Sequence, residues 1–150
     1  MPTKRVIKKA RADKRAGKSP TTQAGEFVHE EIEHIREGKH GARSTKQAIA
    51  IGLSKARRAG VKLPPPRKGK TSEETRAQAR RDSAKGQAPA RKTSPKRSRA
   101  TRAALKKEGK QAASHASLSR QAKSSAKKRG PADLRRAAQR AARTRAADKG

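Results

Sequence analysis

Large apolar side chains are concentrated in one part of the chain, residues 24–63. In its first half, Val28, Ile32 and Ile35 recur at i, i+4 and i+7, the spacing that places side chains on one face of a helix. Carboxylates gather mostly in the first half of this stretch, where the helix dipole favours negative charge. The pattern predicts a helix over residues 25–38.

A second apolar pattern follows after a short Gly-containing turn and predicts a helix over residues 44–59. Ser44 at its start and Gln47 three residues later form a capping box. Gly60 provides a natural end, and the prolines at 64–66 prevent the helix from continuing. Together the two helices predict a helical hairpin.

The hairpin is too small to be stable alone, since a single core below about 40 residues usually needs outside support. We therefore expect residues 25–63 to pair with a second copy, in a four-helix homodimer, or to pack on a partner. The face expected to make this contact consists of Phe27, Val28, Ile32, Ile35, Ile49 and Leu53.

The remaining segments have no strong apolar stripe. Residues 1–23 are predicted to be a disordered basic arm, and residues 64–97 a Pro/Gly/basic linker with a short helix at 72–85. Residues 98–150 form a low-complexity Ala/Lys/Arg tail with helical tendency. The expected fold class is all-α: a small helical hairpin flanked by largely disordered basic arms, with partial helices rich in Ala, Lys and Arg.

Composition explains why these arms are expected to be disordered. Hydrophobic residues make up 29% of the 150 residues, aromatic residues 1% and charged residues 37%. Ordering one residue costs roughly 1–2 kcal/mol, which so little apolar surface does not offset. The tail contains helix-prone stretches at 98–108, 111–129 and 131–147, which have good propensity but little to bury. We expect these stretches to be partly helical in the free protein.

The charge is strongly positive and unevenly distributed. The chain has 43 Lys and Arg against 12 Asp and Glu, a formal net charge of +31. Eight basic residues and one acidic residue give residues 1–20 a charge of +7, and 20 basic and three acidic residues give residues 86–150 a charge of +17. Residues 24–38 carry −4, from five Glu and one Arg. Such a chain attracts polyanions, of which nucleic acid is the most abundant, and we favour DNA over RNA.

The basic residues expected to contact phosphate lie in the two arms and at the end of the second helix. In the last helix-prone stretch, arginines share one arc beside alanines, and a guanidinium group can donate two parallel hydrogen bonds to a phosphate. The predicted contacts are Lys4, Arg5, Lys8, Lys9, Arg57, Arg58, Lys96, Arg97, Arg99, Arg102, Lys127, Lys128, Arg129, Arg135, Arg136, Arg140 and Arg143.

Two motifs bear on sequence specificity. Ser94-Pro95-Lys96-Arg97 resembles the Ser-Pro-basic-basic motif of linker-histone tails, in which a turn would present two cations to the DNA backbone. Phosphorylation of Ser94 would add roughly −1.5 to −2 charges and weaken binding. Helix 44–59 could be the recognition helix of a helix–turn–helix, but only Gln47 near its start suits base readout. Sequence-specific recognition is therefore not expected.

No enzyme, cofactor or metal site is predicted. The chain has no cysteine, and no nucleophile–base constellation is recognisable. His29 and His34 are five residues apart, whereas a zinc-binding helix needs a separation of four. His29 with Glu33, or Glu30 with His34, could chelate a metal only weakly, and a solvated polar face is the favoured interpretation.

The chain is expected to be cytoplasmic. No apolar run approaches the roughly 20 residues that a membrane span requires. The first residues are basic and contain no apolar signal-peptide region. A membrane-spanning or secreted protein is therefore not expected from the sequence.

A resemblance to a known family is carried by residues 42–60, which read Ala-Arg-Ser-Thr-Lys-Gln-Ala-Ile-Ala-Ile-Gly-Leu-Ser-Lys-Ala-Arg-Arg-Ala-Gly. This stretch resembles a family of small basic bacterial proteins of unknown function, with a Lys-Gln-Ala-Ile-Ala-Ile-x-Leu-Ser-x-Ala core. Members are often labelled DNA-binding or plasmid-stabilisation proteins, and some longer members have similar basic extensions. The likeness is clearest over about 28–63. It implies DNA binding and supplies no catalytic residues.

These observations lead to one favoured function and two alternatives. The favoured one is a nucleoid-associated, histone-like protein that binds the DNA phosphate backbone without strong sequence specificity and could bridge or compact DNA. The first alternative is an RNA- or ribosome-binding protein, although scarce aromatic residues argue against stacking on single strands. The second is a protein-interaction module whose acidic helix docks a partner while the tail only localises the complex.

Overall fold

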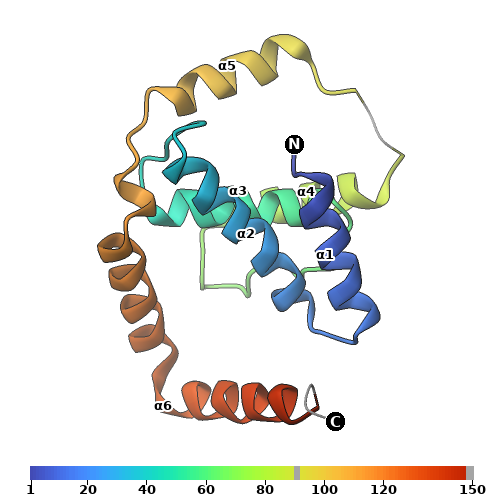
Figure 1. The fold of residues 1–150 in the computed structure, drawn as a ribbon, viewed down its shortest axis with the longest axis vertical. Coiled ribbons are helices and arrows are strands. Elements are labelled where there is room, and N and C mark those ends of the chain that lie inside the picture. The colour runs from blue at the N-terminus through green and yellow to red at the C-terminus, as the bar shows by residue number, and fades with distance from the viewer. Residues whose placement is uncertain (90–91, 148–150) are drawn as a thin grey trace. The chain divides into compact units, whose positions relative to one another are not determined.

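The computed structural model describes residues 1–89 and 92–147 (Figure 1). Within these ranges every regular element is a helix and no strand occurs, which confirms the all-α class. The chain forms two compact units, Met1–Ser114 and a second that begins at His115. The elements in chain order are α1 (Lys4–Arg15), α2 (Pro20–Arg36), α3 (Thr45–Arg58), α4 (Glu73–Gln87), α5 (Pro95–Lys106), the 3-10 helix η1 (Gln111–Ala113) and α6 (His115–Ala147).

Helices α2 and α3 form the centre of the first unit. α2 begins at Pro20, five residues before the expected start, because Ser19 caps it and proline fits the first helical position. α3 begins after Ser44, whose hydroxyl accepts a hydrogen bond from the backbone amide of Gln47. The two helices approach closely at Gly52, where an added Cβ would lie 2.7 Å from the Cα of Val28. Only a residue without a side chain permits this crossing.

The expectation that residues 1–23 form a disordered arm is wrong. They contain α1 and the start of α2, which pack against each other. Thr3 caps α1, and its hydroxyl accepts a hydrogen bond from the backbone amide of Val6 at 3.4 Å. Val6, Ile7 and Ala10 face the core of the unit. These three modest side chains are enough to hold α1 in place because α2 already presents an apolar surface that they cover.

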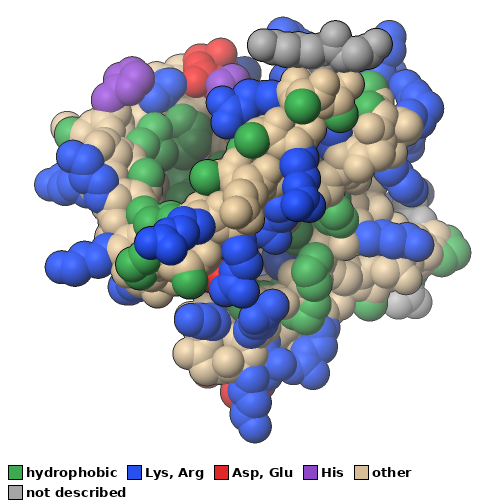
Figure 2. Space-filling view, turned by 90° about the horizontal axis from the view of Figure 1, so that it is seen from below, with side chains coloured by type: hydrophobic (Ala, Val, Ile, Leu, Met, Phe, Trp, Pro, Cys, Tyr) green, Lys and Arg blue, Asp and Glu red, His purple; other side chains and the backbone are tan. Residues whose placement is uncertain are grey.

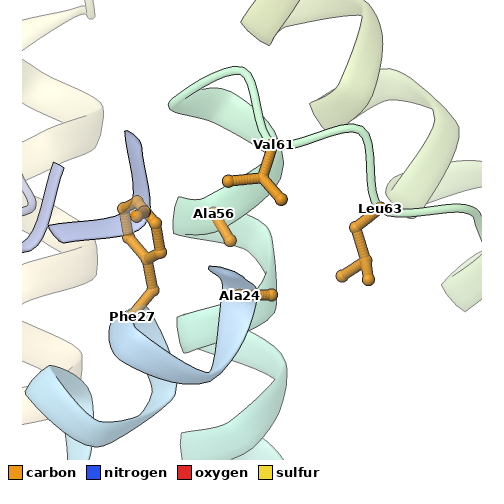
Figure 3. Packing of buried hydrophobic residues seen from close by; sticks show 6 residues of the cluster. Ala24, Phe27, Ala56, Val61 and Leu63 are labelled. Atoms are coloured by element: carbon orange, nitrogen blue, oxygen red, sulfur yellow. The ribbon is translucent and has the colours of Figure 1, made fainter. Parts of the chain in front are cut away.

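The hydrophobic core of the first unit is small and built largely from alanine. Figure 3 shows Ala24 and Phe27 from α2 beside Ala56 of α3 and Val61 of the following loop. Phe27 is 1% exposed, and Leu63 completes the cluster from the same loop. Alanine at the contact points lets helix backbones approach closely, so little apolar volume is needed to fill the space.

The apolar face assigned to a second copy is mostly covered within the chain. Helix α1 packs on α2, α2 on α3, and α3 on α4, so one chain supplies four packed helices (Figure 1). The support that the hairpin requires is thus available in the same molecule. Of the six residues of that face, Phe27, Ile32 and Ile35 are buried, and Val28, Ile49 and Leu53 are half-buried.

Helix α4 and the loop before it are held by polar contacts to α3. Ala79 and Asp82 are the buried residues of α4. The guanidinium group of Arg57 donates to the carbonyl oxygens of Leu63 at 3.4 Å and Pro64 at 3.1 Å. Arg57 is 7% exposed, and burial lowers the pKa of its side chain. Its role is to fix the proline-containing loop over the end of α3.

The tail is also helical, not disordered, over its described residues. Helix α5 begins at Pro95, earlier than expected. The end of α5 is tied to the loop between α2 and α3, and the segment after α5 is tied to the start of α3. The amide of Gly41 donates to Leu105 at 2.9 Å, and the buried hydroxyl of Thr45 donates to Ala112 at 2.7 Å. These long-range hydrogen bonds order a segment that has little apolar surface of its own.

Helix α6 of the second unit has two halves. Gly130 has a φ of +77° and interrupts the helical geometry, and Pro131 starts the second half. This boundary is where the sequence places a helix end. No residue of α6 is buried, so high helix propensity rather than packing accounts for its form. No helix in the described residues combines the length and apolar character needed to cross a membrane.

Candidate nucleic-acid interface

A stripe of four cations runs along the outer face of α1. Lys4, Lys8, Arg11 and Arg15 follow the spacing i, i+4, i+7 and i+11. At about 100° per residue these positions fall within an arc of roughly 60°, and at about 1.5 Å per residue they extend over about 16 Å. The buried face of α1, around Ala10, lies on the other side of the helix. We call these four residues the α1 stripe.

The α1 stripe is available for an anionic ligand. All four side chains are exposed, and together with Ile7 they line a shallow surface groove. Within the described residues none of the four has an ion-pair partner, whereas Lys9 next to them pairs with Glu26 at 2.7 Å. The local carboxylates are thus used by other cations, and the positive charge of the stripe is uncompensated.

Helix α5 presents a second set of cations. Arg99, Arg102 and Lys106 are spaced i, i+3 and i+7, all are exposed, and the helix contains no acidic residue. The Ser-Pro-basic-basic motif begins this helix rather than forming a separate turn. Ser94 is its N-cap, and its hydroxyl accepts a hydrogen bond from the amide of Arg97 at 3.5 Å. The helix thereby orients the cations that the motif was expected to present.

The first half of α6 has a third stripe. Arg120, Lys123 and Lys127 are spaced i, i+3 and i+7 and are exposed. At about 100° per residue they share an arc of roughly 60°. The stripe ends near Gly130, where the helix breaks. It therefore covers an arc as narrow as that of the α1 stripe, with three cations instead of four.

The second half of α6 has a broader basic face. Arg135, Arg136, Arg140 and Arg143 are exposed and fall within an arc of roughly 140°. Arg136 donates to Asp133 at 2.8 Å, which neutralises part of the charge near the start of this half. Figure 2 shows the general result, since Lys and Arg far outnumber Asp and Glu on the visible surface.

Most of the predicted phosphate contacts are accessible, with one correction. Arg57 is buried and donates to two backbone carbonyls, so it is removed from the candidate interface. Arg58 remains exposed, but its Nε donates to Asp82 at 2.9 Å. The other predicted residues are also exposed: Lys4, Arg5, Lys8, Lys9, Lys96, Arg97, Arg99, Arg102, Lys127, Lys128, Arg129, Arg135, Arg136, Arg140 and Arg143.

Sequence reasoning missed several cations of these stripes. They are Arg11 and Arg15 of α1, Lys106 of α5, and Arg120 and Lys123 of α6. The helical spacing that reveals them is present in the sequence. A disordered segment has no helix faces, so the expectation of disorder at the N-terminus concealed this spacing.

One cluster outside the basic stripes has the chemistry of a metal site. The sequence suggested pairs on a single helix, such as His29 with Glu33. The structure instead brings Glu31 and His34 of α2 together with His40 of the following loop, and their ligand atoms all lie within 4.8 Å of one another. Spacing along one helix could not reveal a ligand that a loop supplies.

Comparison with known proteins gives one match. The model of a family of unknown function (DUF6496) matches residues 11–68, which extend from α1 through α2 and α3 into the following loop. The match covers less than half of the chain and carries no function with it. Neither the curated proteins nor the solved structures contain a match to this chain.

Proposed function

We propose that the protein binds the phosphate backbone of double-stranded DNA without strong sequence preference, as a nucleoid-associated, histone-like protein. The observation that carries the proposal is the α1 stripe, an ordered row of four exposed cations with no carboxylate partner within the described residues. Duplex DNA carries about one negative charge per 1.7 Å of axis, so a row of about 16 Å meets many phosphates. The stripes of α5 and α6 add to the same attraction.

Contacts to phosphate are favoured over contacts to bases. Base readout by a helix–turn–helix would require α3 to present side chains at a groove. Near the end of α3, Arg57 is buried and Arg58 is engaged with Asp82. Lysine and arginine on α1 and α6 suit phosphate oxygens and carry little sequence information by themselves.

Bridging or compaction of DNA follows from having stripes on both units. One molecule could contact two DNA segments, and a homodimer through residues 25–63 would double the number of contacts. Phe27 and Ile35, which were expected to contact the second copy, are buried within the chain. Bridging by one molecule does not require this dimer. Sedimentation of the full chain, with and without a short duplex, distinguishes one copy from two.

The salt dependence of DNA binding tests the proposal. Fluorescence anisotropy with a labelled duplex should give a strongly negative slope of log affinity against log salt. Replacing Lys4, Lys8, Arg11 and Arg15 by Gln should reduce the magnitude of this slope by about 3 to 4, since each neutralised phosphate contributes about 0.9. An affinity that does not change with salt would contradict the proposal.

A matched control removes the same charge elsewhere. Lys46, Lys62, Lys68 and Lys70 are exposed and lie outside the stripes, so their replacement by Gln should change the slope less. An equal change would mean that total charge, rather than the α1 stripe, determines binding. Competition with duplex RNA in the same assay tests the RNA-binding alternative, which predicts the higher affinity for RNA.

A further inference from the structure

The cluster of Glu31, His34 and His40 joins two parts of the first unit. Glu31 and His34 are three residues apart on α2 and share one face of that helix. His40 lies in the loop that leads to α3, and its ring meets the His34 ring edge-on, with centroids 6.2 Å apart at 80°. Two imidazoles and one carboxylate are a common ligand set for divalent transition metals.

Burial makes this cluster unlike a solvated surface group. Glu31 is 1% exposed, and the His40 side chain is 13% exposed. The carboxylate oxygen Oε1 of Glu31 is buried and accepts no hydrogen bond within the described residues. It pairs with the His40 ring at 3.2 Å, but a buried carboxylate oxygen that accepts no hydrogen bond is costly, so a metal cation beside it would be stabilising.

The histidine facing this oxygen is oriented as a ligand. His40 Nδ1 lies 3.1 Å from the carbonyl oxygen of Gly41, and since a carbonyl only accepts, Nδ1 carries the ring proton in this contact. In the neutral ring Nε2 then has a lone pair, and it lies 3.2 Å from Glu31 Oε1. In a tetrahedral site with bonds of about 2.0–2.1 Å, ligand atoms are about 3.3 Å apart. A metal ion between the two atoms fits this separation.

The surroundings support the same assignment. Metal-ligating histidines usually donate their other N–H to a carbonyl or carboxylate, as His40 does to Gly41. Lys55 pairs with the other oxygen of Glu31, Oε2, so Oε1 is the oxygen that faces the His40 ring.

We propose that Glu31, His34 and His40 form a binding site for one Zn²⁺-like divalent metal ion, with the remaining position open to water. The ligand atoms lie within 4.8 Å of one another, so the side chains must draw closer together to hold an ion. Because the site links α2 to the loop before α3, the metal would stabilise that connection. The role is structural, and it is independent of DNA binding by the basic stripes.

Metal titration of the untagged full chain, stripped with a chelator, tests this proposal. We expect one Zn²⁺ per chain, and visible absorption bands of a tetrahedral site when Co²⁺ replaces it. His34→Gln and His40→Gln should each weaken Zn²⁺ affinity by more than about 100-fold. Loss of a residue that only hydrogen-bonds to a metal ligand already weakens affinity by about 10–100-fold. Thermal unfolding should shift to higher temperature when Zn²⁺ is added to the wild type.

Matched controls are available in the same chain. His29→Gln and His115→Gln remove histidines outside the cluster and should leave Zn²⁺ affinity unchanged. Lys55→Met removes a competing positive charge and should tighten binding by more than about threefold. Circular dichroism shows which variants are folded. If a histidine variant is unfolded, the Zn²⁺ affinity of Lys55→Met tests the proposal instead.

Three results would overturn the metal site. They are absence of Zn²⁺ uptake by the wild type, equal losses in the His29 and His115 controls, and no change of affinity in folded Lys55→Met. None of these results would affect the proposed DNA binding, which is measured separately.

Discussion

At the scale of single residues, Asp82 shows how a very basic chain uses its few carboxylates. Asp82 of α4 is 1% exposed and accepts hydrogen bonds from Ser54 at 2.7 Å, Arg58 at 2.9 Å and Gln78 at 3.1 Å. Burial raises its pKa, but the three hydrogen bonds and the charge of Arg58 outweigh burial, so the pKa lies below its ordinary value. This carboxylate therefore joins α4 to α3.

Asp82→Asn should destabilise the first unit by about 1–3 kcal/mol, because an amide cannot accept from all three donors and leaves buried groups unpaired. Urea unfolding followed by circular dichroism measures the effect. Glu73→Gln in the same helix is the matched control, since Glu73 is exposed and its pair with Arg76 is a surface salt bridge. The control should cost less than about 1 kcal/mol. Equal costs would mean that Asp82 does not anchor α4.

The contribution of Asp82 should also depend on pH. Its folded pKa is depressed, so the unfolded chain takes up the proton first as the pH falls below the ordinary value of 3.8. The stabilisation is present above that value and is lost as the pH falls through the folded pKa. The difference in unfolding free energy between wild type and Asp82→Asn should accordingly shrink below about pH 4. A difference that grows toward acid would contradict this assignment.

At the scale of elements, helix crossings are set by small residues. α2 and α3 cross at Gly52, whose added Cβ would meet the backbone of Val28 at 2.7 Å. A backbone atom cannot rotate away as a side chain can, so the helices themselves would have to separate. The apolar pattern predicts that the two helices pack, but it does not locate the point where they touch.

Gly52→Ala should destabilise the protein by about 1–3 kcal/mol through overpacking, despite the better helix propensity of alanine. Gly25→Ala is the matched control, because Gly25 lies in α2 with nothing within 4 Å of its added Cβ. That variant should stabilise by up to about 1 kcal/mol. Thermal melting of both variants gives opposite shifts if the crossing is as described, and shifts of the same sign if it is not.

Two helix boundaries follow from local signals in the sequence. Ser44 marks the start of α3, and Gly130 the break in α6, through local capping and turn preferences. α1 was missed because its inward face, built around Ala10, is too modest to identify a buried helix. Of the four cations of the α1 stripe, the sequence therefore predicts only Lys4 and Lys8 as phosphate contacts.

At the scale of the whole molecule, the two units divide the charge between them. The segment 115–150 has 11 basic and two acidic residues, a net charge of +9, and its helix has no buried residue. The segment 1–114 contains the core and the buried carboxylates. We therefore expect the folding of the first unit to be separable from the charge that residues 115–150 contribute.

A chain shortened to residues 1–114 should unfold at nearly the same temperature as the full protein, because the core residues lie within this segment. It should bind DNA more weakly and with a smaller salt slope, by about 0.9 for each phosphate that the shorter chain no longer neutralises. Melting curves and anisotropy titrations of the two chains measure both effects. Loss of the folded state on truncation would show that α6 supports the first unit.

The sequence by itself determined the charge, the all-α class and the positions of the helices with clear apolar periodicity. These features depend on composition and on neighbours within a few residues, and both are visible in the sequence itself. The tertiary structure decided that α1 and α4 cover the hairpin, that Arg57 is buried, and that His40 meets Glu31. Each of these depends on contacts between distant segments, because burial and the pairing of charges follow from which helices pack together rather than from residue type.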